Sequence, residues 1–311
     1  MTTTGYEALH DGAALVDLTG RGKIRLSGED RARLLHAMTT NHVNDLKPGH
    51  GLYAFFLNAQ GRVLADVNIW NMGDSFLLDT EPETAKLVYQ HLDKFIIADD
   101  VTLSDETEET ATWYVEGPSA GSVVQSAGFP VPDEPFNSME ENGILTAKVN
   151  GIFLYCPLAE KEVVAKRLRN AGAVHASAEE FLLYRLEQRR PRYGVDFSEA
   201  QIPQETQQMQ AIHFSKGCYL GQEIVERVRS RGHVNKQLVS LAIAGCSAPA
   251  AETKIFSGDK EVGEITSAAF SPMQNHVVAF GYVRTEAIRS QSPLVVGEVP
   301  AKIVEDGKGN V

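Results

Sequence analysis

The sequence changes character near Lys236, and this change constrains the fold more than any other feature. Before it, segments with strand and helix patterns alternate along the chain. After it, the apolar segments are all short and are separated by turn residues, at residues 238–243, 254–256, 261–266, 277–283 and 294–296. Short strands at turn spacing are typical of a small barrel. We therefore predict a C-terminal β-barrel over residues 237–311.

The first 236 residues favour an antiparallel meander covered by helices. We expect helices near residues 29–38, 82–95, 118–127 and 160–170, and a further one that a capping box at Ser177 opens and Pro191 stops. The segment 129–142 is rich in Pro, Asp, Glu and Asn and predicts a surface loop. Strands are expected at residues 14–27 (two, around a glycine turn), 51–57, 63–70, 75–78, 101–103, 112–116 and 152–156. This order indicates an α+β fold.

Composition and charge limit the function classes. The net charge of −12 argues against binding duplex nucleic acid through a general basic face. Residues 99–109 hold six acids and no base, whereas residues 185–236 hold nine Lys/Arg against six Asp/Glu. That local basic zone is compatible with an anionic small molecule, with one RNA contact, or with a salt-bridged surface.

The spacing of the cysteines and the lengths of the apolar segments indicate in which cellular compartment the protein is expected. The three cysteines are far apart and form no CxxC pair, so neither a disulfide framework nor a zinc site is expected. The first six residues lack the pattern of a signal peptide, and no apolar run is long enough to span a bilayer. We expect a cytoplasmic protein without membrane contact or stably bound metal, and a monomer.

The segment from Lys216 to Glu223 reads Lys-Gly-Cys-Tyr-Leu-Gly-Gln-Glu. It places Cys218 between a lysine and the predicted start of a helix after Gly221. A nearby ammonium group and a helix N-terminus both favour the thiolate, which is the nucleophilic form of cysteine. The alternative is a small, buried, inert cysteine.

Two carboxylates form a second group of candidates. Asp66 lies among apolar residues in an alternating strand, and Glu187 lies late on the capped helix, shortly before Tyr193. Carboxylates near apolar surface can accept hydrogen bonds from a ring bearing N–H groups, and burial raises their pKa. The structural alternatives are a solvent-facing Asp66 and an ion pair of Glu187 with Arg190 or Arg192.

Several segments together resemble one family. They are residues 25–30, 39–41, 46–51, 57–62, 185–187 with 193–194, and 216–227. Their order is similar to that in the aminomethyltransferase (glycine-cleavage T-protein) superfamily. The Lys-Gly-Cys-Tyr-x-Gly-Gln-Glu motif resembles that of the folate-binding YgfZ branch, which includes iron–sulfur assembly factors.

The resemblance implies a clover of three domains around a central pocket for tetrahydrofolate or a one-carbon derivative of it. Residues 1–236 would form two α+β lobes, roughly 1–50 with 111–236, and 51–110, beside the barrel. It also implies roles for single residues. Asp66 would lie near the reacting nitrogens of the folate, Glu187 would bind the pterin, and Tyr193, Arg227 and Arg229 would line the pocket or hold the glutamate tail. Cys218, with Lys216, would distinguish the branch.

Three functions follow from these features. The first, which the resemblance favours, is a folate-binding accessory factor for iron–sulfur proteins, including tRNA-modifying radical-SAM enzymes, with Cys218 as the key thiol. The second is a folate-dependent aminomethyl or methyl transferase, for which Asp66 is essential; aminomethyltransferases have paired aspartates where this chain has Ala65 and Asp66, and they lack the cysteine motif. The third is a tRNA- or protein-binding module.

Overall fold

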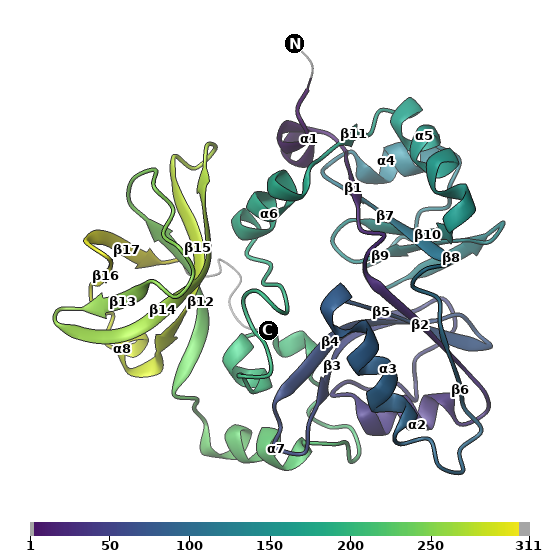
Figure 1. Ribbon diagram of the computed structural model, residues 1–311, viewed down its shortest axis with the longest axis horizontal. Coiled ribbons are helices and arrows are strands. Elements are labelled where there is room, and N and C mark those ends of the chain that lie inside the picture. Colours follow the sequence, from purple (N-terminus) through teal and green to yellow (C-terminus); the bar gives the residue numbers. More distant parts are fainter. Residues whose placement is uncertain (1–2, 305–311) are drawn as a thin grey trace. The chain divides into compact units, whose positions relative to one another are not determined.

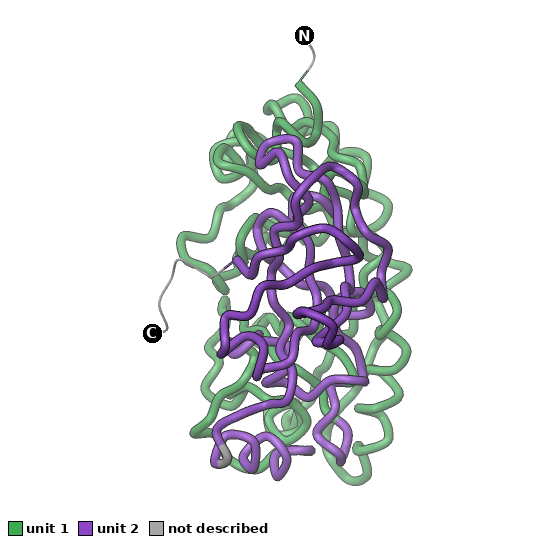
Figure 2. Tube along the Cα trace, turned by 90° about the vertical axis from the view of Figure 1, so that its left-hand side faces the viewer, with its two compact units in different colours: residues 1–57, 64–181, 210–220 green, residues 58–63, 182–209, 221–311 purple. Residues whose placement is uncertain are grey.

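The computed structural model describes residues 3–304 and contains two sheets, a closed barrel and the helices around them (Figure 1). The Cα trace separates into two compact units (Figure 2). Unit 1 comprises residues 1–57, 64–181 and 210–220, and unit 2 comprises residues 58–63, 182–209 and 221–311.

A six-stranded sheet in unit 1 has the order β11-β1-β7-β10-β9-β8. Its core joins the central strands to apolar residues of two helices, among them Val124 and Leu168. The buried residues of each helix recur three or four positions apart, as in an amphipathic helix. The strands are β1 (Ala14–Asp17), β7 (Thr110–Glu116), β8 (Ser138–Glu141), β9 (Ile144–Lys148), β10 (Ile152–Pro157) and β11 (Val174–His175), with helices α1 (Gly5–Asp11), α4 (Ala120–Ser126) and α5 (Lys161–Asn170) and the 3₁₀ turn η2 (Leu158–Glu160).

A five-stranded sheet in unit 1 has the order β3-β4-β5-β2-β6. Leu34 and Leu35 from one helix and Val88 and Leu92 from another join its buried core. The elements are β2 (Gly22–Ser27), β3 (Gly51–Leu57), β4 (Val63–Asn71), β5 (Ser75–Thr80), β6 (Thr102–Asp105), α2 (Arg31–Met38), η1 (Pro82–Thr84) and α3 (Ala85–Asp93).

Unit 2 contains a closed barrel with the strand order β12-β15-β14-β13-β16-β17. Its outer face carries Leu238 and Phe280, which pack with Leu186 of a preceding helix. The barrel elements are β12 (Lys236–Ile243), β13 (Lys254–Ser257), β14 (Lys260–Ser271), β15 (His276–Arg284), β16 (Leu294–Val296), β17 (Val299–Ile303) and α8 (Thr285–Arg289). The connecting elements of the chain are α6 (Ala178–Glu187), η3 (Pro203–Thr206), η4 (Met209–Ala211) and α7 (Gln222–Arg231).

The structure confirms the α+β class and the C-terminal barrel, and it corrects two details. The predicted loop at 129–142 is wrong at its end, because β8 pairs there with β9. The strands β1 and β2, although consecutive in sequence, belong to different sheets. The capping box at Ser177 is confirmed, since the Glu180 amide donates to Ser177 Oγ at 3.2 Å and the Ser177 amide donates to the Glu180 carboxylate at 2.8 Å. Among residues 3–304, no helix is long and apolar enough to cross a bilayer.

Candidate functional site

Asp66 is buried in β4, with only 8% of its surface exposed. The Tyr53 hydroxyl on β3 donates a hydrogen bond of 2.9 Å to its Oδ2. Its other oxygen, Oδ1, is buried and has no hydrogen-bond partner among residues 3–304. The solvent-facing alternative for Asp66 is therefore wrong. Burying a carboxylate oxygen without a hydrogen-bond donor is energetically costly. Such oxygens are found at catalytic and ligand-binding sites.

A group of charged side chains lies around Asp66, and no local sequence pattern indicates it. The Arg21 guanidinium lies 2.5 Å from Asp79 and also pairs with Glu81. The second oxygen of Asp79 accepts a hydrogen bond from the Tyr155 hydroxyl. That hydroxyl in turn accepts a hydrogen bond of 3.3 Å from the Trp70 indole. Arg21 thus balances two carboxylates directly, whereas Asp66 forms no ion pair with any cation among residues 3–304.

This arrangement raises the pKa of Asp66 from 3.8 to about 7. Burial is the largest cause, and the charge of Glu81 adds to it, while Arg21 and the Tyr53 hydrogen bond oppose it. A carboxyl group with a pKa near neutral can both accept and deliver a proton, which is what acid–base catalysis requires.

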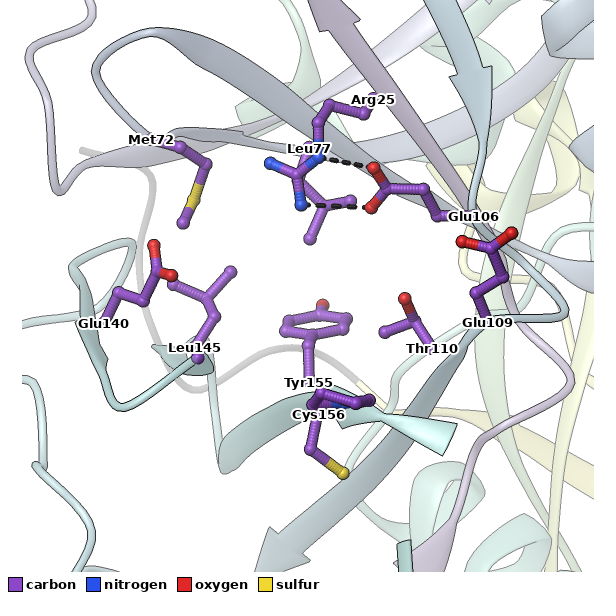
Figure 3. Close-up of a pocket in the computed structure, with 12 residues that line it drawn as sticks. Arg25, Met72, Leu77, Glu106, Glu109, Thr110, Glu140, Leu145, Tyr155 and Cys156 are labelled. Atoms are coloured by element: carbon purple, nitrogen blue, oxygen red, sulfur yellow. Dashed lines mark hydrogen bonds and ion pairs between the residues drawn. The ribbon is translucent and has the colours of Figure 1, made fainter. Parts of the chain in front are cut away.

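A hollow of about 340 Å³ borders this group of side chains (Figure 3). Figure 3 shows Tyr155 on one side of it, and Arg25 paired with Glu106 on another. The guanidinium and carboxylate make two bonds, of 2.6 and 3.0 Å. Because its basic side chain is already paired and its other charged residues are acidic, the hollow is unsuited to an anion.

Lys216 is buried, and its amine holds the cysteine loop against the end of α2. The Nζ atom donates to the carbonyl oxygens of His36 and Thr39, both at 2.5 Å, and of Asn41 at 2.9 Å. An ammonium group has three N–H donors, so all of them are used. Burial lowers the pKa of Lys216 to about 7. Lys216 therefore serves first as an anchor for the loop.

Cys218 lies on this anchored loop, and its side chain is exposed. The inert, buried alternative is therefore wrong for Cys218, whereas Cys156 does fit it, because it is buried and burial raises its pKa to about 11. The predicted helix is confirmed: α7 begins at Gln222, directly after Gly221 with a φ of 80°. That helix belongs to unit 2 and the thiol to unit 1. The effect of the helix N-terminus on the thiol stays a prediction.

Three imidazole rings lie next to the anchored loop, and the sequence analysis missed them as a group. The His36 and His42 rings are 4.6 Å apart and the His42 and His213 rings 5.2 Å apart, measured between centroids. Burial, and then the charge of Lys216, lower the pKa of His36 to about 4, so His36 is neutral at physiological pH. No group of three or more His, Cys, Asp or Glu side chains within residues 3–304 is placed to hold a metal ion.

Glu187 and Tyr193 lie in unit 2. Glu187 is the last residue of α6, and its Oε1 accepts a bond of 2.6 Å from the Ser271 hydroxyl on β14. Tyr193 is buried and its hydroxyl donates to the Val63 carbonyl oxygen at 3.3 Å. Arg185 and Asp196, which flank both candidates in sequence, form a buried ion pair of 2.5 Å that fixes the backbone around them.

Arg227 and Arg229 are exposed on α7. The Arg229 Nη1 lies 3.5 Å from the Glu226 carboxylate. The structure therefore places Asp66, Lys216 and Cys218 in unit 1, and the other candidates (Glu187, Tyr193, Arg227, Arg229) in unit 2. The single pocket for all of them stays a prediction, as does the division of residues 1–236 into two lobes.

Comparison with known proteins identifies both parts of the chain. The model of the GCVT N-terminal domain matches residues 2–216, and that of the glycine cleavage T-protein C-terminal barrel domain matches residues 236–306. An aminomethyltransferase of Rubrobacter xylanophilus is 27% identical, over 96% of this chain and 84% of its own length. A chloroplastic protein of Arabidopsis thaliana named as a transferase is 26% identical, over 96% of this chain and 72% of its own length.

The fold has a counterpart among solved structures. The glycine cleavage system aminomethyltransferase T of Bartonella henselae superposes with a TM-score of 0.89 at 18% identity, over 97% of this chain and 88% of that one. This confirms the predicted aminomethyltransferase fold, with its α+β part and its C-terminal barrel.

Proposed function

Because this chain belongs to the glycine cleavage T-protein family, we propose that it is a folate-dependent one-carbon transferase with Asp66 at the reacting centre. The observation that carries the proposal is the buried Oδ1 of Asp66, which has no donor among residues 3–304. The cysteine motif by itself favours an accessory factor for iron–sulfur proteins over this function. The relatives named as aminomethyltransferases support the transferase instead.

The residues present fit tetrahydrofolate. Its ring and bridge nitrogens carry N–H groups, which are the donors that Asp66 Oδ1 lacks. Bound tetrahydrofolate would supply the nitrogen that carries or accepts the one-carbon unit. Asp66 would accept a hydrogen bond from that nitrogen when ionised and hold a proton against it when neutral. A pKa of about 7 makes both forms available at neutral pH.

Glu187 completes the proposed recognition of the pterin ring. Its carboxylate is held at Oε1 by Ser271, which orients it for N–H and NH₂ groups of a ligand. Tyr193 would line the pocket, and Arg227 and Arg229, both exposed, would bind the carboxylates of the glutamate tail.

Calorimetric titration with reduced tetrahydrofolate under anaerobic conditions tests the proposal. We expect saturable binding that weakens at least about tenfold in Asp66→Ala and in Glu187→Ala, since each loses a charge-assisted hydrogen bond. Asp259→Ala, which removes an exposed carboxylate of the barrel, is the matched control and should bind like the parent. Equal affinity in the parent and in Asp66→Ala would exclude Asp66 from the site.

The second candidate function is an accessory role in assembly or repair of iron–sulfur proteins, as in the YgfZ branch. The exposed Cys218 on an anchored loop favours it, because this thiol is accessible and its loop is held in place. Iron–sulfur clusters use several thiolates, so a client or assembly protein would have to complete the coordination. We place this role, with its link to tRNA modification, in the cytoplasm.

Complementation of a strain lacking the protein separates the two functions. The accessory role predicts that Cys218→Ser abolishes the recovery of iron–sulfur enzyme activity, whereas Cys246→Ser, which removes another exposed thiol, does not. Full recovery by soluble Cys218→Ser protein would rule out the thiol step. If Asp66→Ala fails to restore iron–sulfur enzyme activity while Cys218→Ser restores it, the result supports the transferase.

A further inference from the structure

A second hollow lies in unit 2, and none of its residues is assigned to folate. It measures about 490 Å³ and borders the outer face of the barrel at β12, β14 and β15, elements labelled in Figure 1. The residues around it are Arg62, Ala200, Glu205, Asn235, Lys236, Glu261, Val262, Gly263, Glu264, Tyr282 and Arg284.

The basic side chains of this hollow have no acidic partner in the part of the chain that the structure describes. Lys236 and Arg284 lie directly opposite each other on the paired strands β12 and β15. Neither makes an ion pair within residues 3–304, and Arg62 donates only to the Ala200 carbonyl oxygen, at 2.6 Å. Like charges directly opposite on neighbouring strands destabilise a sheet. An anion between them would remove that repulsion.

The acidic side chains of the hollow, by contrast, have partners. Lys254, which is not part of the hollow, lies 2.8 Å from Glu264 and 3.5 Å from Glu261. Glu205 accepts a hydrogen bond of 3.2 Å from the Ile202 amide. Lys254 supplies one positive charge for these two carboxylates, and the amide does not neutralise Glu205. Counting Lys254, four cations face three carboxylates, which leaves one positive charge in excess.

Tyr282 supplies a second and independent observation. It is 3% exposed, and its buried hydroxyl has no hydrogen-bond partner among the described residues. The Lys236 amine lies 4.7 Å from the centre of its ring. Burial, and then the charges of Glu205 and Asp196, raise the pKa of Tyr282, so the hydroxyl keeps its proton and can donate it to an acceptor in the hollow.

We propose that this hollow binds a small anion that bears carboxylate or phosphate groups. Lys236, Arg284 and Arg62 would balance the charge, and the Tyr282 hydroxyl would donate to one of the oxygens. The assignment goes beyond the folate function and does not depend on it.

Calorimetry on the full chain at low ionic strength tests the proposal, with inorganic phosphate and with glutarate as separate probes. We expect saturable binding of at least one probe, and the probe that binds identifies the ligand as a phosphate or as a carboxylate. Arg284→Gln and Lys236→Gln should each weaken binding about tenfold or more, which is the loss of one charge-assisted hydrogen bond.

Two kinds of variant make the result specific. Lys302→Gln removes an exposed cation from β17 of the same barrel and should leave the affinity unchanged. Asp66→Ala should also leave it unchanged, which separates this site from the proposed folate function. Tyr282→Phe should bind more weakly, yet should be no less stable without ligand, because the hydroxyl that it removes has no partner.

Absence of saturable heat with both probes up to about 20 mM, where binding would be worth only about 2 kcal/mol, would overturn the proposal. So would an equal loss of affinity in Lys302→Gln and Arg284→Gln, since that would show unspecific attraction to positive charge.

Discussion

Replacing Asp66 by asparagine tests the electrostatics of the candidate site without any ligand. Asparagine keeps an oxygen that can accept the hydrogen bond from Tyr53, and it removes the charge. The direction in which stability changes with pH follows from the pKa of Asp66, which is raised in the folded protein. Burial favours protonated Asp66 over ionised Asp66 in the folded protein. Asp66 therefore costs no stability below pH 3.8, and its cost grows as the pH rises toward 7.

The magnitude comes from the two pKa values. Raising the pKa from 3.8 to about 7 lowers the free energy of unfolding by about 4 kcal/mol above neutral pH. At pH 5 the same calculation gives a cost that is smaller by about 3 kcal/mol, because folded Asp66 is then protonated. The stability of Asp66→Asn relative to the parent should thus increase by about 3 kcal/mol between pH 5 and pH 8.

Urea unfolding of both proteins at these two pH values measures this difference. The two tryptophans, Trp70 and Trp113, both lie in unit 1, so their fluorescence follows the unit that contains Asp66. Asp259→Asn, an exposed substitution in the barrel, should change the stability by less than about 0.5 kcal/mol at either pH. If Asp66→Asn differs from the parent by the same amount at pH 5 and pH 8, Asp66 does not titrate near neutral pH and the argument is wrong.

Other substitutions test the anchors and the thiols. Lys216→Met leaves three buried carbonyl oxygens without a donor and should lower the free energy of unfolding by about 3 kcal/mol in urea unfolding; an unchanged value would refute its role as an anchor. Arg185→Met leaves the Asp196 carboxylate buried without its cation and should cost about 3–5 kcal/mol, measured by thermal unfolding. In a thiol-reagent assay at pH 8, the exposed Cys218 and Cys246 should react quickly. Cys156 should react slowly, because it is buried and its pKa is about 11. Cys218→Ser should remove one of the two fast-reacting thiols.

Much of the fold could be predicted because its signals are local. The turn glycine Gly221, the capping box at Ser177 and the apolar strands of the barrel each depend on neighbours in sequence. Two of the strands that were not predicted, β8 and β17, lack such signals. Three of the four residues of β8 are exposed, and β17 contains Pro300, which has no N–H for a strand ladder, so pairing with other strands defines both.

The candidate site could be predicted only in part, for the same reason. The sequence identifies Asp66, but its environment depends on contacts distant in the chain. Arg21 meets Asp79 and Glu81 through the pairing of β2 with β5. The carbonyl oxygens that bind Lys216 come from residues at least 175 positions away. No local pattern encodes either arrangement.

The path of the chain between the two units limits how this protein could have changed in evolution. The boundaries after residues 57, 63, 181, 209 and 220 mean that the chain crosses from one unit to the other five times. No single break in the gene can therefore separate unit 1 from unit 2. A gene fragment that encodes the barrel strands alone would omit residues 58–63 and 182–209, including Leu186, which covers the outer apolar face. Recombination that exchanged the barrel strands alone would therefore leave this apolar face without Leu186.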